Sequence, residues 1–192
     1  VLIFPNHENI LNMIPFAWVP EETVKKRLEK GDRFYKNMID QNYLLQTPGN
    51  VTDYDYIKNK IIEWSDMFNI IKVGFDEHNS HYLITTLTKY IDLEKFQPIG
   101  QSITKLNAPT KQFENYIKTK KINHGGNPLF RWSMRNVILY RDANDNYKPS
   151  KRYALDKIDV IIAAINGCAS YWDLVDDIDL DERFKNEGFT NG

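Results

Sequence analysis

The chain has 192 residues, 42% of them hydrophobic and 13% aromatic, which is typical of one globular domain with a packed core. Its longest apolar run, around Val160–Ile165, is too short to cross a membrane, and the first residues lack a signal peptide's charged start and apolar core, so we expect no membrane partner. The net charge of −1 conceals a basic block, residues 105–157, with 12 Lys and Arg against four acids, and an acidic tail, residues 173–192, with seven acids against two basic residues. The block's net +8 is a possible footprint for nucleic acid, although a solvated surface is the ordinary alternative.

The first third of the chain predicts two strands followed by helices. We expect strands at 1–4 and 10–20, joined by a turn, and helices at 20–28, 33–44 and 53–68. Pro20 opens the first of these helices, and Thr52 or Asp53 caps the third. Asp55, in the first turn of that third helix, fits a favourable interaction with the helix macrodipole better than a ligand role.

The remainder alternates strands and helices, which indicates an α/β class. We predict a strand at 70–76, a helix at 80–91, a short strand at 94–100, and a helix that Asn107 and Pro109 start and that runs to Lys121. After a loop at 123–128 come a helical turn, a strand and a hairpin turn at 143–146. The last element, Leu155–Trp172, is apolar nearly all round and is expected to be a buried helix.

One strand ends on a carboxylate. Ile70, Ile71, Val73 and Phe75 are strand formers that run directly into Asp76, and an amphipathic helix follows. In open α/β sheets, functional sites lie just beyond the carboxyl ends of the strands. Asp76 is therefore a candidate site residue, and the alternative is that it only caps the next helix.

A second carboxylate lies in the apolar last helix. Asp159 sits between Ile158 and Val160, where an isolated charge would carry a large desolvation penalty unless it is paired, protonated or bound to metal. Asp156 is its i, i+3 neighbour, so both can face one side of the helix start. The alternative is that Asp156 caps the helix and Asp159 faces its dipole. If these acids meet Asp76, a hard divalent cation would relieve their repulsion.

Other chemistries find little support. The histidines have no zinc-site spacing, and the single cysteine, Cys168, can supply neither a thiolate set nor an internal disulfide, which suits a core role in a reducing compartment. The sequence contains no Walker A phosphate loop and no G-x-S-x-G nucleophile elbow.

An ordered set of segments resembles a known family. The segments are "PFAWVPEET", "TPGNVTDYDYI", "VGFDEHNS", "APTKQFENYI", "HGGNPLFRWSMRNV", "NYKPSK" and "KIDVIIAAI". Together they resemble the nuclease domain of the large terminase subunit of tailed double-stranded DNA bacteriophages. The resemblance covers residues 1–172, with the acidic tail at 173–192 outside it. It implies an RNase H-like fold, a mixed sheet flanked by helices, and a divalent-metal-dependent endonuclease that cuts concatemeric double-stranded DNA.

The resemblance also assigns roles. It implies that Asp76 and Asp159 are catalytic metal ligands, with Asp156 as a less certain third, and that two Mg²⁺ or Mn²⁺ ions activate a water and stabilise the leaving oxygen. The basic residues expected to hold the DNA backbone are Arg131, Arg135, Lys148 and Lys151; for each, the alternative is a solvated surface charge. The family further implies the phage portal and the small terminase subunit as partners, in the cytoplasm of a bacterial host.

One departure from the family pattern affects activity. The family carries a further catalytic Asp on the first strand of its sheet, and no acid precedes Val1. We therefore expect that this chain starts at the second strand, lacks one metal ligand and the upstream ATPase, and is a piece of something longer. The competing hypotheses are a non-catalytic module that docks on DNA or the portal, and another RNase H-like enzyme such as a junction resolvase or integrase.

Overall fold

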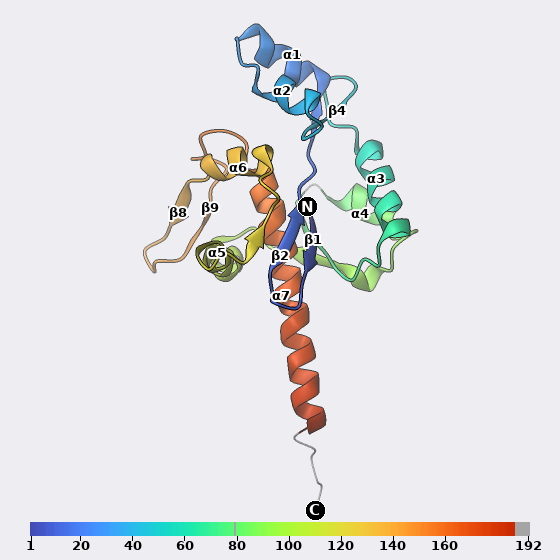
Figure 1. Cartoon of the computed structure of the whole chain (residues 1–192), viewed down its shortest axis with the longest axis vertical. Coiled ribbons are helices and arrows are strands. Elements are labelled where there is room, and N and C mark those ends of the chain that lie inside the picture. Colours follow the sequence, from blue (N-terminus) through green and yellow to red (C-terminus); the bar gives the residue numbers. More distant parts are fainter. Residues whose placement is uncertain (79, 187–192) are drawn as a thin grey trace, which may run out of the picture.

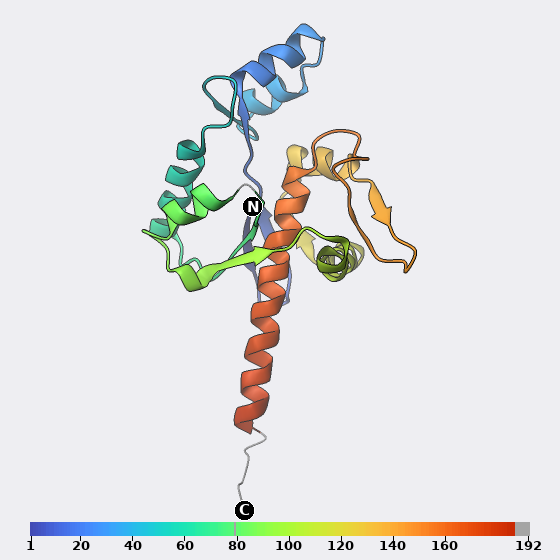
Figure 2. The same cartoon turned by 180° about the vertical axis from the view of Figure 1, so that it is seen from behind.

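The structure is a computed structural model that describes residues 1–78 and 80–186, with side chains up to residue 176 (Figures 1 and 2). Its strands are β1 (Leu2–Pro5), β2 (Leu11–Ile14), β3 (Trp18–Pro20), β4 (Leu45–Thr47), β5 (Val73–Asp76), β6 (Phe96–Ile99), β7 (Ile122–Asn123), β8 (Leu139–Arg141) and β9 (Tyr147–Pro149). Its α-helices are α1 (Glu21–Glu29), α2 (Phe34–Asp40), α3 (Tyr54–Met67), α4 (His81–Leu87), α5 (Ile103–Lys118), α6 (Pro128–Arg135) and α7 (Asp159–Asn186), and a short 3-10 helix covers Leu93–Lys95.

The strands form several small sheets. β1 pairs antiparallel with β2, which pairs parallel with β7; β3–β4 and β5–β6 are parallel pairs, and β8–β9 is an antiparallel hairpin. The expected mixed α/β class is therefore confirmed. Within the described residues, however, the strands do not pair into one continuous mixed sheet.

Helix α7 is the centre of the fold. It runs behind β1 and β2 through the middle of the body, with α5 and α6 on one side and α3 and α4 on the other, and its second half extends beyond them (Figures 1 and 2). Its buried residues include Val160, Ile161, Ile162, Ala164, Ile165, Cys168, Ala169 and Trp172. The prediction of a buried apolar helix is thus confirmed, and so is the core position of Cys168, whose thiol pKa is raised by burial.

Two glycines allow strands to approach α7 closely. A Cβ on Gly74, in β5, would lie 2.3 Å from the backbone oxygen of Asn166 and 2.4 Å from Ser170 Oγ. A Cβ on Gly167, in α7, would lie 2.8 Å from Cδ1 of Ile3 in β1. The backbone of β5 therefore contacts the backbone of α7 directly, and this contact fixes where β5 ends.

Several predicted boundaries need correction. The expected strand at 10–20 is divided into β2 and β3, because Pro15 lacks an N–H with which to continue the ladder. The helix expected to start at Asn107 begins at Ile103, where Ser102 caps it by accepting a hydrogen bond from Lys105 N, and Pro109 lies inside it. By contrast, Asp53 caps α3 and Pro20 precedes α1, as predicted.

The last helix also differs from its prediction. It begins at Asp159 rather than near Leu155, and it continues through residue 172, the predicted end of the domain. That boundary stays a prediction. The acidic tail lies largely outside the residues whose side chains are described. Among the described residues, no helix is long and apolar enough to span a membrane.

We expect Gly74→Ala to lower the free energy of unfolding by about 1–3 kcal/mol, the usual range for overpacking, because the new methyl group meets rigid backbone of α7. Gly167→Ala is the matched control: its methyl group meets only the movable end of Ile3, and alanine favours a helix over glycine by about 1 kcal/mol. Urea unfolding of both variants measures the difference. Equal destabilisation by the two substitutions would contradict the backbone contact.

Candidate functional site

An open groove of about 1040 Å³ contains Asp76. One wall is the end of β5 and the turn after it, with Asp76, Glu77 and His78; the other is the segment after β9, with Ser150, Lys151 and Arg152. The groove is also lined by Gln101 after β6, Leu106 in α5 and Ile162 in α7. The groove therefore brings together the end of β5, the first turns of α7 and the basic segment after β9, which are distant in sequence.

Asp76 is the last residue of β5 and is partly buried. Its Oδ1 accepts a hydrogen bond of 2.9 Å from His78 N, and its backbone oxygen accepts one from Ser80 Oγ. The residue at the N-cap of α4 is Ser80. Asp76 thus shapes the turn after the strand and does not cap the next helix, and the residue lines the groove.

Asp159 opens α7 and forms an ion pair with the loop opposite. Lys151 Nζ lies 2.7 Å from Asp159 Oδ1, and the two side chains are 59% and 60% exposed, respectively. Asp159 is paired, which is one of the three outcomes expected at this position, but the pair carries no large desolvation penalty, because the helix starts at this residue and its side chain reaches solvent before the buried stretch begins. Its negative charge at a helix N-terminus is favourable in any case.

The contact between β5 and α7 brings both acids to the same end of the fold. Gly74 touches Asn166, and Gln101, next to β6, donates a hydrogen bond of 3.2 Å to the side chain of that same asparagine. Asp76 lies two residues beyond Gly74, about 6.6 Å along a strand, and Ile162 lies four residues before Asn166, about 6 Å along a helix. Asp76 and Ile162 share the groove, and Asp159 starts the same turn of α7.

Asp156 has a different partner. Arg27 NH2 of α1 lies 2.5 Å from Asp156 Oδ1, and NH1 of the same guanidinium lies 2.7 Å from Asp32. Burial alone would raise the pKa of the Asp156 carboxyl, but the hydrogen bonds from Arg27 and from the Lys157 N–H outweigh it and lower that pKa. Asp156 precedes α7 and does not cap it, so its role as a metal ligand stays a prediction that would require release from Arg27.

The four predicted DNA-binding residues separate into two pairs. Lys148 and Lys151 line the groove, and Lys148 Nζ donates to the backbone oxygen of Gln101. Arg131 and Arg135 are exposed on α6 and are not among the lining residues. Sequence reasoning missed Arg152, which lines the groove. The signal was its adjacency to Lys151.

The donor set suits a hard cation only in part. Mg²⁺ is commonly held by one or two carboxylates with several waters and a substrate phosphate, which Asp76 and Asp159 could provide. Among the described residues, however, no group of three or more His, Cys, Asp or Glu side chains is close enough together to hold a metal ion. The residues therefore fit one water-rich site and do not form a closed cage.

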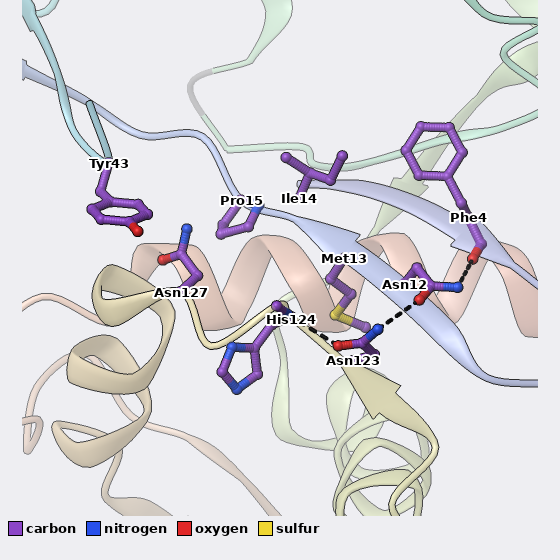
Figure 3. A pocket seen from close by; sticks show the side chains of 10 residues that line it. Phe4, Asn12, Met13, Ile14, Pro15, Tyr43, Asn123, His124 and Asn127 are labelled. Atoms are coloured by element: carbon purple, nitrogen blue, oxygen red, sulfur yellow. Dashed lines mark hydrogen bonds between the residues drawn. The ribbon is translucent and has the colours of Figure 1, made fainter. Parts of the chain in front are cut away.

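A second cavity, of about 290 Å³, lies between β2, Tyr43 and the loop before α6 (Figure 3). Its lining includes Asn12, Asn123 and Asn127 but no carboxylate. Asn123 donates to Asn12, which donates to the backbone oxygen of Phe4 (Figure 3). Asn127 accepts from Phe130 N and caps α6. The amides of Asn12 and Asn123 thus bridge β1, β2 and β7.

Comparison with known proteins identifies the family. The model of the terminase large subunit, endonuclease domain, matches residues 1–173, and the chain belongs to this family. It is 23% identical over 160 residues to the large terminase subunit of Enterobacteria phage HK97, and 28% identical over 162 residues to protein YmfN of Escherichia coli K12. These alignments cover 81% and 80% of this chain but 31% and 35% of the relatives, so the chain spans about a third of their length.

The fold comparison agrees with the family. The crystal structure of the HK97 large terminase superposes with a TM-score of 0.74 at 22% identity, covering 85% of this chain and 34% of that one. The resemblance identified from the ordered segments is thereby confirmed.

The Arg27–Asp156 pair predicts a pH-dependent stability. Because the pKa of Asp156 is lowered on folding, its contribution is present above the unfolded value of about 3.8 and is lost as pH falls through the lower folded value. We expect Asp156→Asn to reduce the free energy of unfolding by about 1–2 kcal/mol near neutral pH, as for a hydrogen bond to a charged group. The difference from wild type should shrink below roughly pH 4.

Denaturant titrations at several pH values measure this difference. Asp40→Asn is the control, because Asp40 pairs with the exposed Lys36. A difference that stays constant between neutral and acidic pH would show that the pair does not carry the effect.

Proposed function

We propose that this domain is a divalent-metal-dependent endonuclease of a phage DNA-packaging terminase, in which Asp76 and Asp159 hold the metal. The observation that carries the proposal is the groove: Asp76 lines it, and Asp159, which is not among its lining residues, is paired to Lys151 of its opposite wall. Membership of the endonuclease-domain family supports the reaction class. The substrate we propose is double-stranded DNA, with the other packaging proteins as partners.

The proposed architecture is RNase H-like. Supporting it, the antiparallel β1–β2 pair and the parallel β5–β6 pair both pack against α7, and the TM-score of 0.74 with a terminase supports the same arrangement. In this architecture the acids sit at the end of a central strand and at the start of the helix that crosses it. A further Asp from a preceding strand of the longer protein would complete the ligand set.

Each of these residues has a proposed role in phosphodiester hydrolysis. Lys148 and Lys151 would hold the phosphate backbone, a contact that carries no base information. Asp76, fixed by the His78 N–H, and Asp159, fixed at the helix start, would orient the site around the scissile phosphate. When bound, Mg²⁺ or Mn²⁺ would supply an activated water and stabilise the leaving oxygen.

Mutation of the two acids tests this function. We expect Asp76→Asn and Asp159→Asn each to reduce Mn²⁺-dependent nicking of supercoiled plasmid at least about 100-fold, because metal-assisted hydrolysis depends on both ligands. The assay uses the chain itself, alongside a form extended upstream by a strand that carries the family's further Asp. Asp40→Asn, on the remote helix α2, is the matched control. Undiminished nicking by both variants would remove Asp76 and Asp159 from the catalytic site, and absence of nicking by the wild-type protein would support a docking module in place of a nuclease.

The Lys151–Asp159 pair leads to a separate expectation for metal affinity. Lys151 is the cation that neutralises Asp159 in this structure, and a metal ion would have to displace it. Because exposed ion pairs contribute about 0.2–1 kcal/mol, the displacement should be easy. We expect Lys151→Met to tighten Mn²⁺ binding only about 1.5- to 5-fold in calorimetric titrations, while Asp159→Asn weakens it.

Metal affinity should also decrease as the pH is lowered, since carboxylates must be deprotonated to bind a metal ion. Lys118→Met, which breaks an exposed ion pair on α5, is the control. An unchanged Mn²⁺ affinity in both Lys151→Met and Asp159→Asn would remove Asp159 from the ligand set.

A further inference from the structure

An exposed pair of tyrosines lies beside the basic wall of the groove. Tyr140, in β8, and Tyr153, just after β9, stack with ring centroids 6.3 Å apart at an interplanar angle of 27°. They are 42% and 49% exposed. Their rings thus present large aromatic surface to solvent next to a candidate catalytic groove.

The hairpin register directs Tyr140 toward that groove. In β8–β9, Tyr140 is directly opposite Lys148, and residues opposite each other in an antiparallel pair project to the same face. Lys148 lines the groove, so Tyr140 is on the groove face. The neighbouring Tyr147 is 8% exposed and its hydroxyl donates to Glu114 of α5. Tyr147 therefore anchors the hairpin, whereas Tyr140 contributes little to holding it on the body.

Basic side chains lie next to the two tyrosines. The Arg152 guanidinium lies 5.5 Å from the Tyr153 ring centroid, and Arg152 lines the groove with Lys148 and Lys151. A positive groove that follows the phosphates, combined with exposed aromatic rings on which bases stack, is the arrangement that single-stranded nucleic acid binders use. In a duplex each base is covered by its neighbours, so the tyrosines could not reach a base face without unstacking it.

We propose that Tyr140 and Tyr153 form a stacking platform for the bases of an unpaired DNA strand, which lies in the groove with its phosphates on Lys148, Lys151 and Arg152. The proposal rests on the proposed function and narrows its substrate to DNA whose strands are parted at the cutting site. Because every base has a stacking face, the platform tolerates any sequence. The tyrosines contribute a salt-independent part of the affinity, and the cations contribute the salt-dependent part.

Binding without metal tests the platform. The probes are a labelled oligothymidylate of about 12 nucleotides, within the site sizes of single-strand binders, and a blunt duplex of the same length, measured by fluorescence anisotropy in EDTA. We expect the wild-type chain to bind the single strand more tightly. Tyr140→Ala should weaken single-strand binding roughly 5- to 100-fold, the range for loss of one stacked base, and leave duplex binding unchanged.

Two further variants separate stacking from folding. Tyr140→Leu keeps an apolar side chain without a ring and should lose single-strand affinity as Tyr140→Ala does, whereas Tyr140→Trp should retain it. Tyr90→Ala, at a tyrosine that is 59% exposed beyond α4, is the matched control and should bind like wild type. Lys148→Ala should reduce the slope of affinity against salt, and the Tyr140 variants should leave that slope unchanged.

Equal affinity for single strand and duplex, or full single-strand affinity in Tyr140→Leu, would overturn the platform. Either result would leave the nuclease proposal standing, because cleavage is measured separately with metal on plasmid DNA. Conversely, loss of the nuclease assignment through the Asp76 and Asp159 variants would not alter the binding results. Failure to bind either DNA would overturn the platform as well.

Discussion

The direct contact between the backbone of β5 and the backbone of α7 is the constraint on which the rest of the structure depends. Gly74 has no side chain, so the strand lies against Asn166 and Ser170 with no layer between them. A buried helix and a strand in such contact cannot slide, because interiors are closely packed and both surfaces are irregular. The end of the strand, Asp76, and the start of the helix, Asp159, are thereby fixed at one end of the domain. The packing of β5 against α7 thus determines the positions of Asp76 and Asp159, although neither acid is part of that contact.

The loops around this frame supply charge. Lys148 lies in β9 and Lys151 in the segment after it, and Tyr147 attaches the β8–β9 hairpin to α5. Arg27 links α1 to Asp156 just before α7, and Phe34 of α2 stacks on Trp132 of α6 with centroids 4.5 Å apart. The α1–α2 unit is therefore connected to the base of the site by the Arg27–Asp156 ion pair and by aromatic contacts of Phe34 and Tyr35 with Trp132. Acids at the strand and helix ends and cations on the surrounding loops suit a phosphate-containing polymer.

Local sequence signals predicted much of the fold. Asp53 at the cap of α3 and the turn at 143–146 of the hairpin act within a few residues, so they are visible in sequence, whereas Pro128, the first residue of α6, was assigned to the loop before it. The start of α5 was misplaced because Pro109 resembles a first-turn proline, whereas Ser102 caps the helix earlier. A large desolvation penalty was expected for an unpaired Asp159, because its neighbours along the chain are apolar. Exposure depends on where the helix starts, and the two partners that matter, Lys151 for Asp159 and Arg27 for Asp156, cannot be inferred from spacing.

The central claim is that Asp76 and Asp159 bind the same metal ion. A crystal structure of the chain grown with Mn²⁺, with anomalous data collected for manganese, measures it most directly. The account requires one anomalous peak between the two carboxylates, with an oxygen of each roughly 2 Å from it, the distance at which oxygen ligands hold small divalent cations. A peak bound by only one of the acids, no peak in the groove, or carboxyl groups more than about 10 Å apart would contradict the account, since a pair of ions in such sites is only about 3.5–4 Å apart.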